Sequence, residues 1–248
     1  MAIYYYCSRI MPDTACWDDL KKLLNIDLEG KRRKITFISG AIDDKAKSKS
    51  YRNGASKNLA ELGIEMQEFT LLWKHTNSSE MEEQILEADM VYLLGGNPYN
   101  QTKYIKDNGL ENILSSYSGI IVGVSCGAMT MSKNVIVPPC GGTYPVADIK
   151  HGLGLTDLSV FPHFDYDLNQ SEVETKDGII EISELLSISS GQQIIGLPNE
   201  SILRCSGNDL YLMGKTPYII ADGDVYETDI TEEKMDNLKV KKLTLFRK

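Results

Sequence analysis

The sequence predicts an α/β fold built on a mainly parallel sheet, because two kinds of segment alternate along its first half. Short apolar runs rich in β-branched residues are typical of buried strands. They occur at residues 34–39, 64–71, 90–94 and 120–124. The longer stretches between them have helical patterning and cover residues 46–62, 79–88 and 101–117. Strands that alternate with helices of this length form right-handed crossovers between parallel strands.

The second half of the chain predicts shorter strands separated by turns. Residues 135–148 are rich in Pro and Gly, a composition typical of loops. The sequence Asp222-Gly223-Asp224 fits a hairpin turn, and strand-like runs occupy residues 193–197, 201–205, 210–213 and 218–221. We therefore expect antiparallel strands added to the sheet toward the C-terminus. The chain has no internal repeat or long linker, so residues 1–248 are predicted to form a single α/β domain.

Composition excludes several classes of partner. The 248 residues carry a net charge of −9, and the pI is near 4.9. Nucleic-acid binding needs clustered positive charge, and an anionic membrane surface attracts basic segments. The N-terminal segment lacks the apolar run of a signal peptide, and no stretch approaches the roughly 20 apolar residues of a membrane-spanning helix. We therefore expect a cytoplasmic protein with no nucleic-acid and no membrane partner.

Cysteine and histidine usage gives no sign of a metal site. The cysteines are odd in number, scattered and without C-x-x-C spacing: Cys7, Cys16, Cys126, Cys140 and Cys205. This pattern predicts free thiols in a reducing compartment. The three histidines lie far apart and form a poor ligand set. No metal and no cofactor are expected.

The most informative segment is Gly123-Val124-Ser125-Cys126-Gly127, which follows an apolar strand and precedes a potential helix. This is the G-x-S-x-G pattern in the strand–turn–helix context of a nucleophile elbow. The turn holds its serine at a helix N-terminus, where developing negative charge is favoured. Cys126 is a rival nucleophile because thiols are intrinsically strong ones. It lies one position off the centre of the pattern, so we expect its side chain to point elsewhere.

Three ordered segments carry a resemblance to a known family. The elbow GVSCGAM, the upstream LLGGNPYNQ at residues 93–101 and the downstream FPHFD at residues 161–165 together resemble the peptidase E and cyanophycinase family of serine peptidases. The resemblance spans residues 34–213, and three ordered motifs are far more specific than one. It implies a three-layer α/β sandwich of the class I glutamine amidotransferase-like (flavodoxin-like) type, consistent with the alternation of strands and helices.

The general base for Ser125 is predicted to be His163. Imidazole can accept a serine proton near neutral pH, and the apolar neighbours of His163 suggest a strand end that would hold its ring. The resemblance also implies that His163 is the catalytic histidine. By contrast, His75 and His151 lie in segments typical of loops.

The turn Gly95-Gly96-Asn97 closes the predicted strand at residues 90–94. Glycine there lets main-chain N–H groups point into a site. The resemblance implies that the N–H groups of Gly96 and Cys126 form the oxyanion hole, each donor contributing about 3–4 kcal/mol to lowering the barrier. Asn97 is expected to bind substrate. Two further segments either line a substrate pocket or pack in the core, namely the Tyr4-Tyr5-Tyr6 run and Tyr99-Asn100-Gln101.

The third member of the catalytic set departs from the family pattern. Some members of the family carry an aspartate some fifteen residues after the serine, where this chain reads PPCGG. Others place an acid in a G-[IL]-x-[DE] segment, which here reads Gly196-Leu197-Pro198-Asn199-Glu200. Either Asn199 orients the imidazole, as an amide does in Cys–His–Asn enzymes, or Glu200 or another acid, Asp148 or Asp165, does so.

These features predict a serine-type peptidase, dipeptidase-like, that hydrolyses small peptides. The resemblance to peptidase E suggests aspartyl dipeptides. Cyanophycinases carry glutamine before the histidine and arginines after it, whereas this chain has Pro162 and no arginine in HFDYDLNQ. An amidotransferase would need cysteine in place of Ser125. The alternative is a catalytically weak or inactive member that acts as a small-molecule, peptide-binding or regulatory protein. The sequence leaves a homodimer open.

Overall fold

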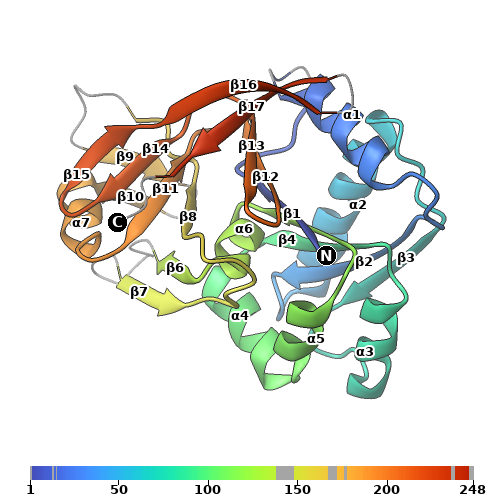
Figure 1. Ribbon diagram of the computed structural model, residues 1–248. Helices are drawn as coiled ribbons and strands as arrows, with labels where there is room; N and C mark the ends of the chain where they lie inside the picture. Colours follow the sequence, from blue (N-terminus) through green and yellow to red (C-terminus); the bar gives the residue numbers. More distant parts are fainter. Residues whose placement is uncertain are drawn as a thin grey trace.

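The computed structural model describes residues 2–245 except 13, 15, 138–147, 167–171, 176–177 and 236–237. Its largest sheet has nine strands in this part of the chain, in the order β16-β17-β13-β12-β1-β5-β4-β2-β3 (Figure 1). Strands β1, β5, β4, β2 and β3 run parallel, as the sequence predicts. Strands β12, β13, β17 and β16 extend this sheet by antiparallel pairing, which confirms the expected addition for residues 201–205 and 210–213. The strands expected at residues 193–197 and 218–221 belong to a second sheet instead.

The parallel half of the main sheet consists of short strands with buried central residues. The strands, in sheet order, are β1 (Ile3–Cys7), β5 (Ile120–Val124), β4 (Met90–Gly96), β2 (Lys34–Gly40) and β3 (Glu68–Leu72). The antiparallel half consists of β12 (Ser201–Ser206), β13 (Asp209–Gly214), β17 (Leu238–Thr244) and β16 (Asp229–Met235).

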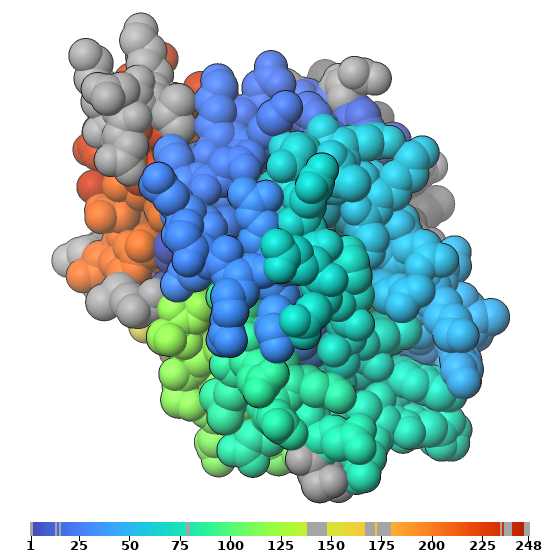
Figure 2. Space-filling model, turned by 90° about the vertical axis from the view of Figure 1, so that its right-hand side faces the viewer, coloured from blue at the N-terminus to red at the C-terminus, as the bar shows by residue number. Residues whose placement is uncertain are grey.

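Helices cover both faces of the main sheet and produce three layers. On one face, α1 (Trp17–Asp27) and α2 (Lys45–Glu61) pack against alternate strand residues such as Tyr5 and Phe37. On the other face, residues such as Tyr6 and Ile38 belong to a second core. That core is covered by α3 (Ser78–Leu86), α4 (Pro98–Asp107), α5 (Leu110–Ser116) and α6 (Cys126–Met131). In Figure 2 the N-terminal part of the chain, coloured blue to green, forms most of the visible face.

A smaller sheet lies beside the main one and has its own apolar core. Its strand order is β15 (Asp224–Glu227), β14 (Tyr218–Ala221), β11 (Gln193–Leu197) and β8 (Val160–Pro162). Phe161, Phe164 and Ile194 are buried in this core with Leu185 of α7 (Ile182–Ile188). Two strand pairs complete the described chain, β6 (Asn134–Val137) with β7 (Asp148–His151) and β9 (Glu172–Thr175) with β10 (Gly178–Glu181).

Three expectations about local structure need correction. The stretch at residues 101–117 is two helices, α4 and α5, because Gly109 adopts a left-handed conformation (φ 70°) that ends the first one. The strand expected at residues 64–71 begins only at Glu68. Residues 134–137 form β6 rather than a loop, and most of the predicted loop lies outside the described residues. The expected turn at Asp222-Gly223 is present, with positive φ at both residues.

Strand β1 occupies the centre of the main sheet and brings the tyrosine run into the core. Tyr5 and Tyr6 are fully buried, so they pack. The Tyr5 hydroxyl donates to Asp27 over 2.5 Å, and Arg204 of β12 donates two hydrogen bonds to the same carboxylate, of 2.8 and 2.7 Å. Burial, followed by the nearby carboxylate, raises the pKa of Tyr5 well above its ordinary value, so this phenol remains a donor.

Within the described residues, no helix has the length and apolarity needed to cross a bilayer.

The buried ion pair between Asp27 and Arg204 yields a test of the fold. Replacing Asp27 with Ala should lower the free energy of unfolding by about 3–5 kcal/mol, because it leaves a buried guanidinium without a counter-charge. The side chains of Asp27 and Arg204 are only 4% and 7% exposed, respectively. Denaturant unfolding measures the change. Asp157→Asn is the control, because that carboxylate is fully exposed and lies 3.8 Å from Lys133. It should change stability by less than about 0.5 kcal/mol. Equal effects of the two substitutions would contradict the prediction.

Candidate active site

The segment around Ser125 forms a sharp strand-to-helix elbow, as predicted. Ser125 links β5 to α6 with φ 54° and ψ −112°, a backbone conformation that is strained for a residue with a side chain. The turn is tight enough to require glycine on either side. A Cβ on Gly123 would lie 2.6 Å from the main chain of Gly127, and one on Gly127 would lie 2.1 Å from the carbonyl oxygen of Leu93. The elbow therefore presents the serine hydroxyl at the start of a helix.

His163 lies directly beside the serine. Its Nε2 is 2.8 Å from Ser125 Oγ, and both residues are half-buried. The histidine follows β8 and also has a positive φ of 62°. Its main-chain N–H donates to Ser8 Oγ over 2.7 Å, and the next N–H, of Phe164, donates to the Leu197 carbonyl over 3.0 Å. These main-chain contacts hold the backbone that carries the imidazole.

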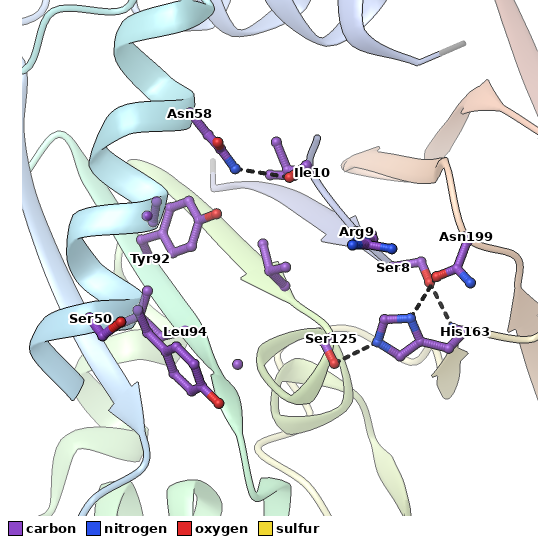
Figure 3. A pocket seen from close by; sticks show the side chains of 15 residues that line it. Ser8, Arg9, Ile10, Ser50, Asn58, Tyr92, Leu94, Ser125, His163 and Asn199 are labelled. Atoms are coloured by element: carbon purple, nitrogen blue, oxygen red, sulfur yellow. Dashed lines mark hydrogen bonds between the residues drawn. The ribbon is translucent and has the colours of Figure 1, made fainter. Parts of the chain in front are cut away.

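Asn199 contacts the far side of the imidazole. Its Oδ1 lies 2.7 Å from Nδ1 of His163. The parallel pairing of β8 with β11, in which Pro162 lies opposite Leu197, brings these two residues together. Asn199 in turn is bonded to Asp165, whose carboxylate accepts from its main-chain N–H over 3.1 Å and from its Nδ2. Figure 3 shows Ser125, His163 and Asn199 at one wall of a pocket.

The other acids considered for the third position have different partners. The Glu200 carboxylate lies 3.8 Å from Lys215 Nζ, and Glu200 itself has a positive φ in the β11–β12 turn. Asp148, on β7, accepts from the N–H of Ile149 and from Lys150. Of the residues that the sequence left open, the structure brings Asn199 to the imidazole, with Asp165 behind it. Glu200, which the sequence also predicts as a catalytic residue, pairs with Lys215.

Cys126 follows the serine, but its thiol faces the protein interior. The side chain is buried, and Sγ is 3.5 Å from Oε1 of Gln101 on α4. Gln101 is itself buried and donates to the carbonyls of Ile38 and Leu94. The thiol therefore points away from His163, as expected from its place in the motif. The main-chain N–H of Cys126 lies at the start of α6.

The turn after β4 approaches the end of β2 very closely. Gly96 has φ 144°, and a Cβ there would lie 2.3 Å from the main chain of Gly40. Asn97, which the sequence predicts to bind substrate, serves instead as the N-cap of α4, with its Oδ1 accepting from the N–H of Asn100 over 2.9 Å. Gly95 lines the pocket, and Asn97 does not belong to its described lining. The geometry therefore gives Asn97 a structural role.

A pocket of about 610 Å³ opens next to Ser125 (Figure 3). This volume lies in the range of small-molecule sites. The β1–α1 connection contributes Ser8, Arg9 and Ile10 to its lining, and α2 contributes Ser50, Tyr51 and Asn58. Tyr92 forms part of the lining, and burial raises the pKa of its phenol. No group of three metal-binding side chains occurs among the described residues.

Comparison with known proteins identifies the family. A profile of peptidase family S51 matches residues 11–213, which is most of the chain. The chain belongs to peptidase family S51. Membership of this family agrees with the predicted resemblance to peptidase E.

Individual relatives of this S51 chain share little sequence with it. An uncharacterized peptidase of Bacillus subtilis (strain 168), YgaJ, is 32% identical over 91 residues, which are 36% of this chain and only 38% of that protein. A peptidase from an acI-B1 actinobacterium superposes with a TM-score of 0.61 at 17% identity, over 91% of this chain and 96% of that one. A Listeria monocytogenes EGD-e protein provisionally assigned to peptidase E gives 0.57 at 18% identity, over 87% and 98%. The two structures support the fold.

Most pocket residues of the S51 chain are missing from the sequence-based prediction, Ser8 and Arg9 among them. Ser8 and Arg9 belong to no motif, and the structure brings them to the site because β1 lies beside β5. The main-chain N–H of Ser125 donates to the Cys7 carbonyl over 2.8 Å, which ties the two strand ends together. A short aromatic run can indicate a strand, but the sequence does not show which strand neighbours it. The place of Arg9 in the pocket therefore follows only from the tertiary structure.

The elbow glycines of the S51 chain yield a matched pair of substitutions. Gly127→Ala should lower the free energy of unfolding by about 1–3 kcal/mol, because its Cβ would overlap the main-chain oxygen of Leu93. Gly54→Ala should raise it by about 0.5–1 kcal/mol, because Gly54 lies inside α2 with open space around it. Denaturant unfolding of both variants measures the difference. A stable Gly127→Ala protein would show that the elbow is looser than described.

Proposed function

We propose that this S51 peptidase hydrolyses small peptides through an acyl-enzyme on Ser125, with His163 as the general base. The observation that carries the proposal is the 2.8 Å contact between Ser125 Oγ and His163 Nε2 at a strained elbow. A serine hydroxyl is a weak nucleophile unless a positioned base accepts its proton. The contact lies at one wall of a pocket, where a substrate carbonyl could reach the hydroxyl.

Acylation begins with attack of Ser125 Oγ on the carbonyl carbon of the scissile peptide bond, while His163 Nε2 accepts the hydroxyl proton. The carbonyl electrons move to oxygen, and the resulting oxyanion accepts hydrogen bonds from the main-chain N–H groups of Gly96 and Cys126. The tetrahedral intermediate then collapses and the C–N bond breaks. His163 returns the proton to the departing amine, which leaves an ester on Ser125.

Deacylation repeats the same proton transfers with water in place of serine. His163 Nε2 accepts a proton from water as its oxygen attacks the ester carbon. Collapse of the second tetrahedral intermediate releases the carboxylic acid and restores the Ser125 hydroxyl with the proton from His163. Asn199 would keep the imidazole in the tautomer with hydrogen on Nδ1 during both steps.

The proposed substrate is a short peptide that carries a negative charge, such as an aspartyl dipeptide. Among the described pocket residues, Arg9 is the only one with a permanent charge, and its side chain is exposed. A guanidinium forms bidentate, charge-assisted hydrogen bonds with a carboxylate. The pocket volume of about 610 Å³ suits a dipeptide better than a polymer.

A second candidate function is a weakly active or inactive family member that binds a small molecule or a peptide. The observation that favours it is Asn199, a neutral residue at the position where an acid supports imidazolium in serine hydrolases.

Three further proposals rest on the sequence: the class I glutamine amidotransferase-like (flavodoxin-like) classification, a cytoplasmic location and a homodimer.

Labelling with a fluorophosphonate probe tests the catalytic assignment. Wild type and Cys126→Ala should be labelled, because the buried thiol does not take part. Ser125→Ala should show no labelling, and in His163→Ala the rate should fall by about 10²–10⁴-fold, the usual contribution of a general base. Folded wild-type protein that does not react would refute the proposed function and favour the binding protein.

Changing the charge of the substrate and the charge at position 9 in turn tests the proposed specificity. In Arg9→Met, kcat/KM for aspartyl dipeptides should fall by about 10- to 100-fold, which corresponds to a charged hydrogen bond of about 1.5–3 kcal/mol. Asparaginyl dipeptides lack the side-chain carboxylate, and dipeptides with an amidated C-terminus lack the terminal one. The loss in Arg9→Met should be smaller for the peptide without the carboxylate that Arg9 binds, and this contrast identifies that carboxylate. The matched control is Arg52→Met on α2, outside the described pocket lining. Equal losses on charged and neutral substrates would contradict the assignment.

A further inference from the structure

The hydrogen bonds from Ser125 continue beyond the third residue to a carboxylate. Ser125 Oγ, His163 Nε2 and Nδ1, and Asn199 Oδ1 follow one another with separations of 2.8 and 2.7 Å. Asn199 Nδ2 then donates to Oδ2 of Asp165, and the Asn199 main-chain N–H donates to Oδ1 of the same carboxylate over 3.1 Å. No acid contacts the imidazole in this line of hydrogen bonds, but Asp165 follows directly after Asn199 in it.

The direction of each hydrogen bond follows from the carboxylate. An ionised carboxylate can only accept hydrogen bonds, so the amide of Asn199 must turn its NH₂ group toward Asp165. Its oxygen then faces His163 and can only accept, which requires hydrogen on Nδ1. A neutral imidazole with hydrogen on Nδ1 leaves Nε2 free to accept the Ser125 proton. One charge thus determines the donor and acceptor roles along the whole line.

We propose that Asp165 is a positioning residue of the active site, which acts on His163 through the amide of Asn199. The proposal rests on the proposed serine-peptidase function. Without Asp165, the two ends of the Asn199 amide have similar shape and no fixed preference, so the amide can turn its NH₂ group to Nδ1. That orientation favours the tautomer with hydrogen on Nε2, which cannot accept the serine proton.

Asp165 also acts through its charge. Arg9, from the β1–α1 connection, lines the same pocket as His163, and Glu200, which follows Asn199 in the chain, pairs with Lys215. A negative charge behind the amide stabilises imidazolium, so removing it makes the imidazole lose its proton at lower pH. The midpoint of a pH–rate profile for Ser125 should therefore move to lower pH when Asp165 is neutralised.

Exchanging the side chains of Asp165 and Asn199 provides the sharpest test. Asn199→Asp alone would place a second carboxylate against Asp165, and the two like charges would repel. The double variant Asn199→Asp/Asp165→Asn keeps one charge and one amide but moves the charge next to the imidazole. The amide at position 165 can then donate to the new carboxylate. Only this arrangement restores a consistent line of donors and acceptors.

The experiment measures the rate of fluorophosphonate labelling against pH. Asp165→Asn should react about tenfold more slowly, with its midpoint at lower pH, and Asn199→Asp should lose at least as much. The double variant should recover to within about threefold of wild type, with its midpoint at higher pH than wild type, because coupled residues are non-additive. Asp157→Asn, at a fully exposed site, is the matched control and should behave as wild type. Thermal unfolding checks that every variant is folded.

Several results would overturn the proposal while leaving the proposed function intact. They are an Asp165→Asn protein with the rate and midpoint of wild type, a double variant no faster than its slower parent, or a larger loss in Glu200→Gln than in Asp165→Asn. An unreactive wild type would instead refute the serine-peptidase function. In that case the NMR signal of the His163 Nδ1 proton decides: the proposal requires this signal to be lost or shifted in Asp165→Asn, and an unchanged signal overturns it.

Discussion

The orientation of one imidazole ring is the constraint on which the candidate active site depends. His163 receives contacts from three separate parts of the chain. Ser8, after β1, accepts from its main-chain N–H, Ser125 contacts Nε2, and Asn199, after β11, contacts Nδ1. A histidine can serve as base only if a single nitrogen faces the nucleophile without hydrogen. The surrounding fold supplies the groups that favour this state.

The two sheets carry different residues of the candidate site. The main sheet carries Ser125 at the end of β5, on an elbow whose glycines permit contact with β4. The smaller sheet carries His163 and Asn199 after the paired strands β8 and β11. The site therefore forms where the two sheets meet. One apolar core joins the two sheets, since Val160 and Ile195 of the smaller sheet belong to the same cluster as Tyr6 of the main sheet. A packed support of this kind is what a hydrogen-bonded constellation requires.

Much of the fold could be predicted from local pattern. The strands β2, β4, β5, β11, β12, β13 and β14 lie where apolar runs bounded by turns indicate them. The errors have local causes: Gly109 divides one predicted helix, and β6 lies directly before a segment dominated by Pro and Gly. The position of β1 between β5 and β12 is a long-range feature, since its neighbours are more than a hundred residues away. No local pattern reports such pairing.

For this protein, the sequence by itself determined the alternation of strands and helices, the elbow at Ser125, the choice of His163 as the histidine beside it and the resemblance to peptidase E. Each of these is encoded in contiguous residues whose spacing or motif has a direct physical meaning. Tertiary structure decided between Asn199 and Glu200, assigned Asn97 to a helix cap, and brought Arg9 and Asp165 to the site. These outcomes depend on which way a turn directs its side chains and on which strands become neighbours. Both are properties of the packed chain, because contacts between distant residues set them.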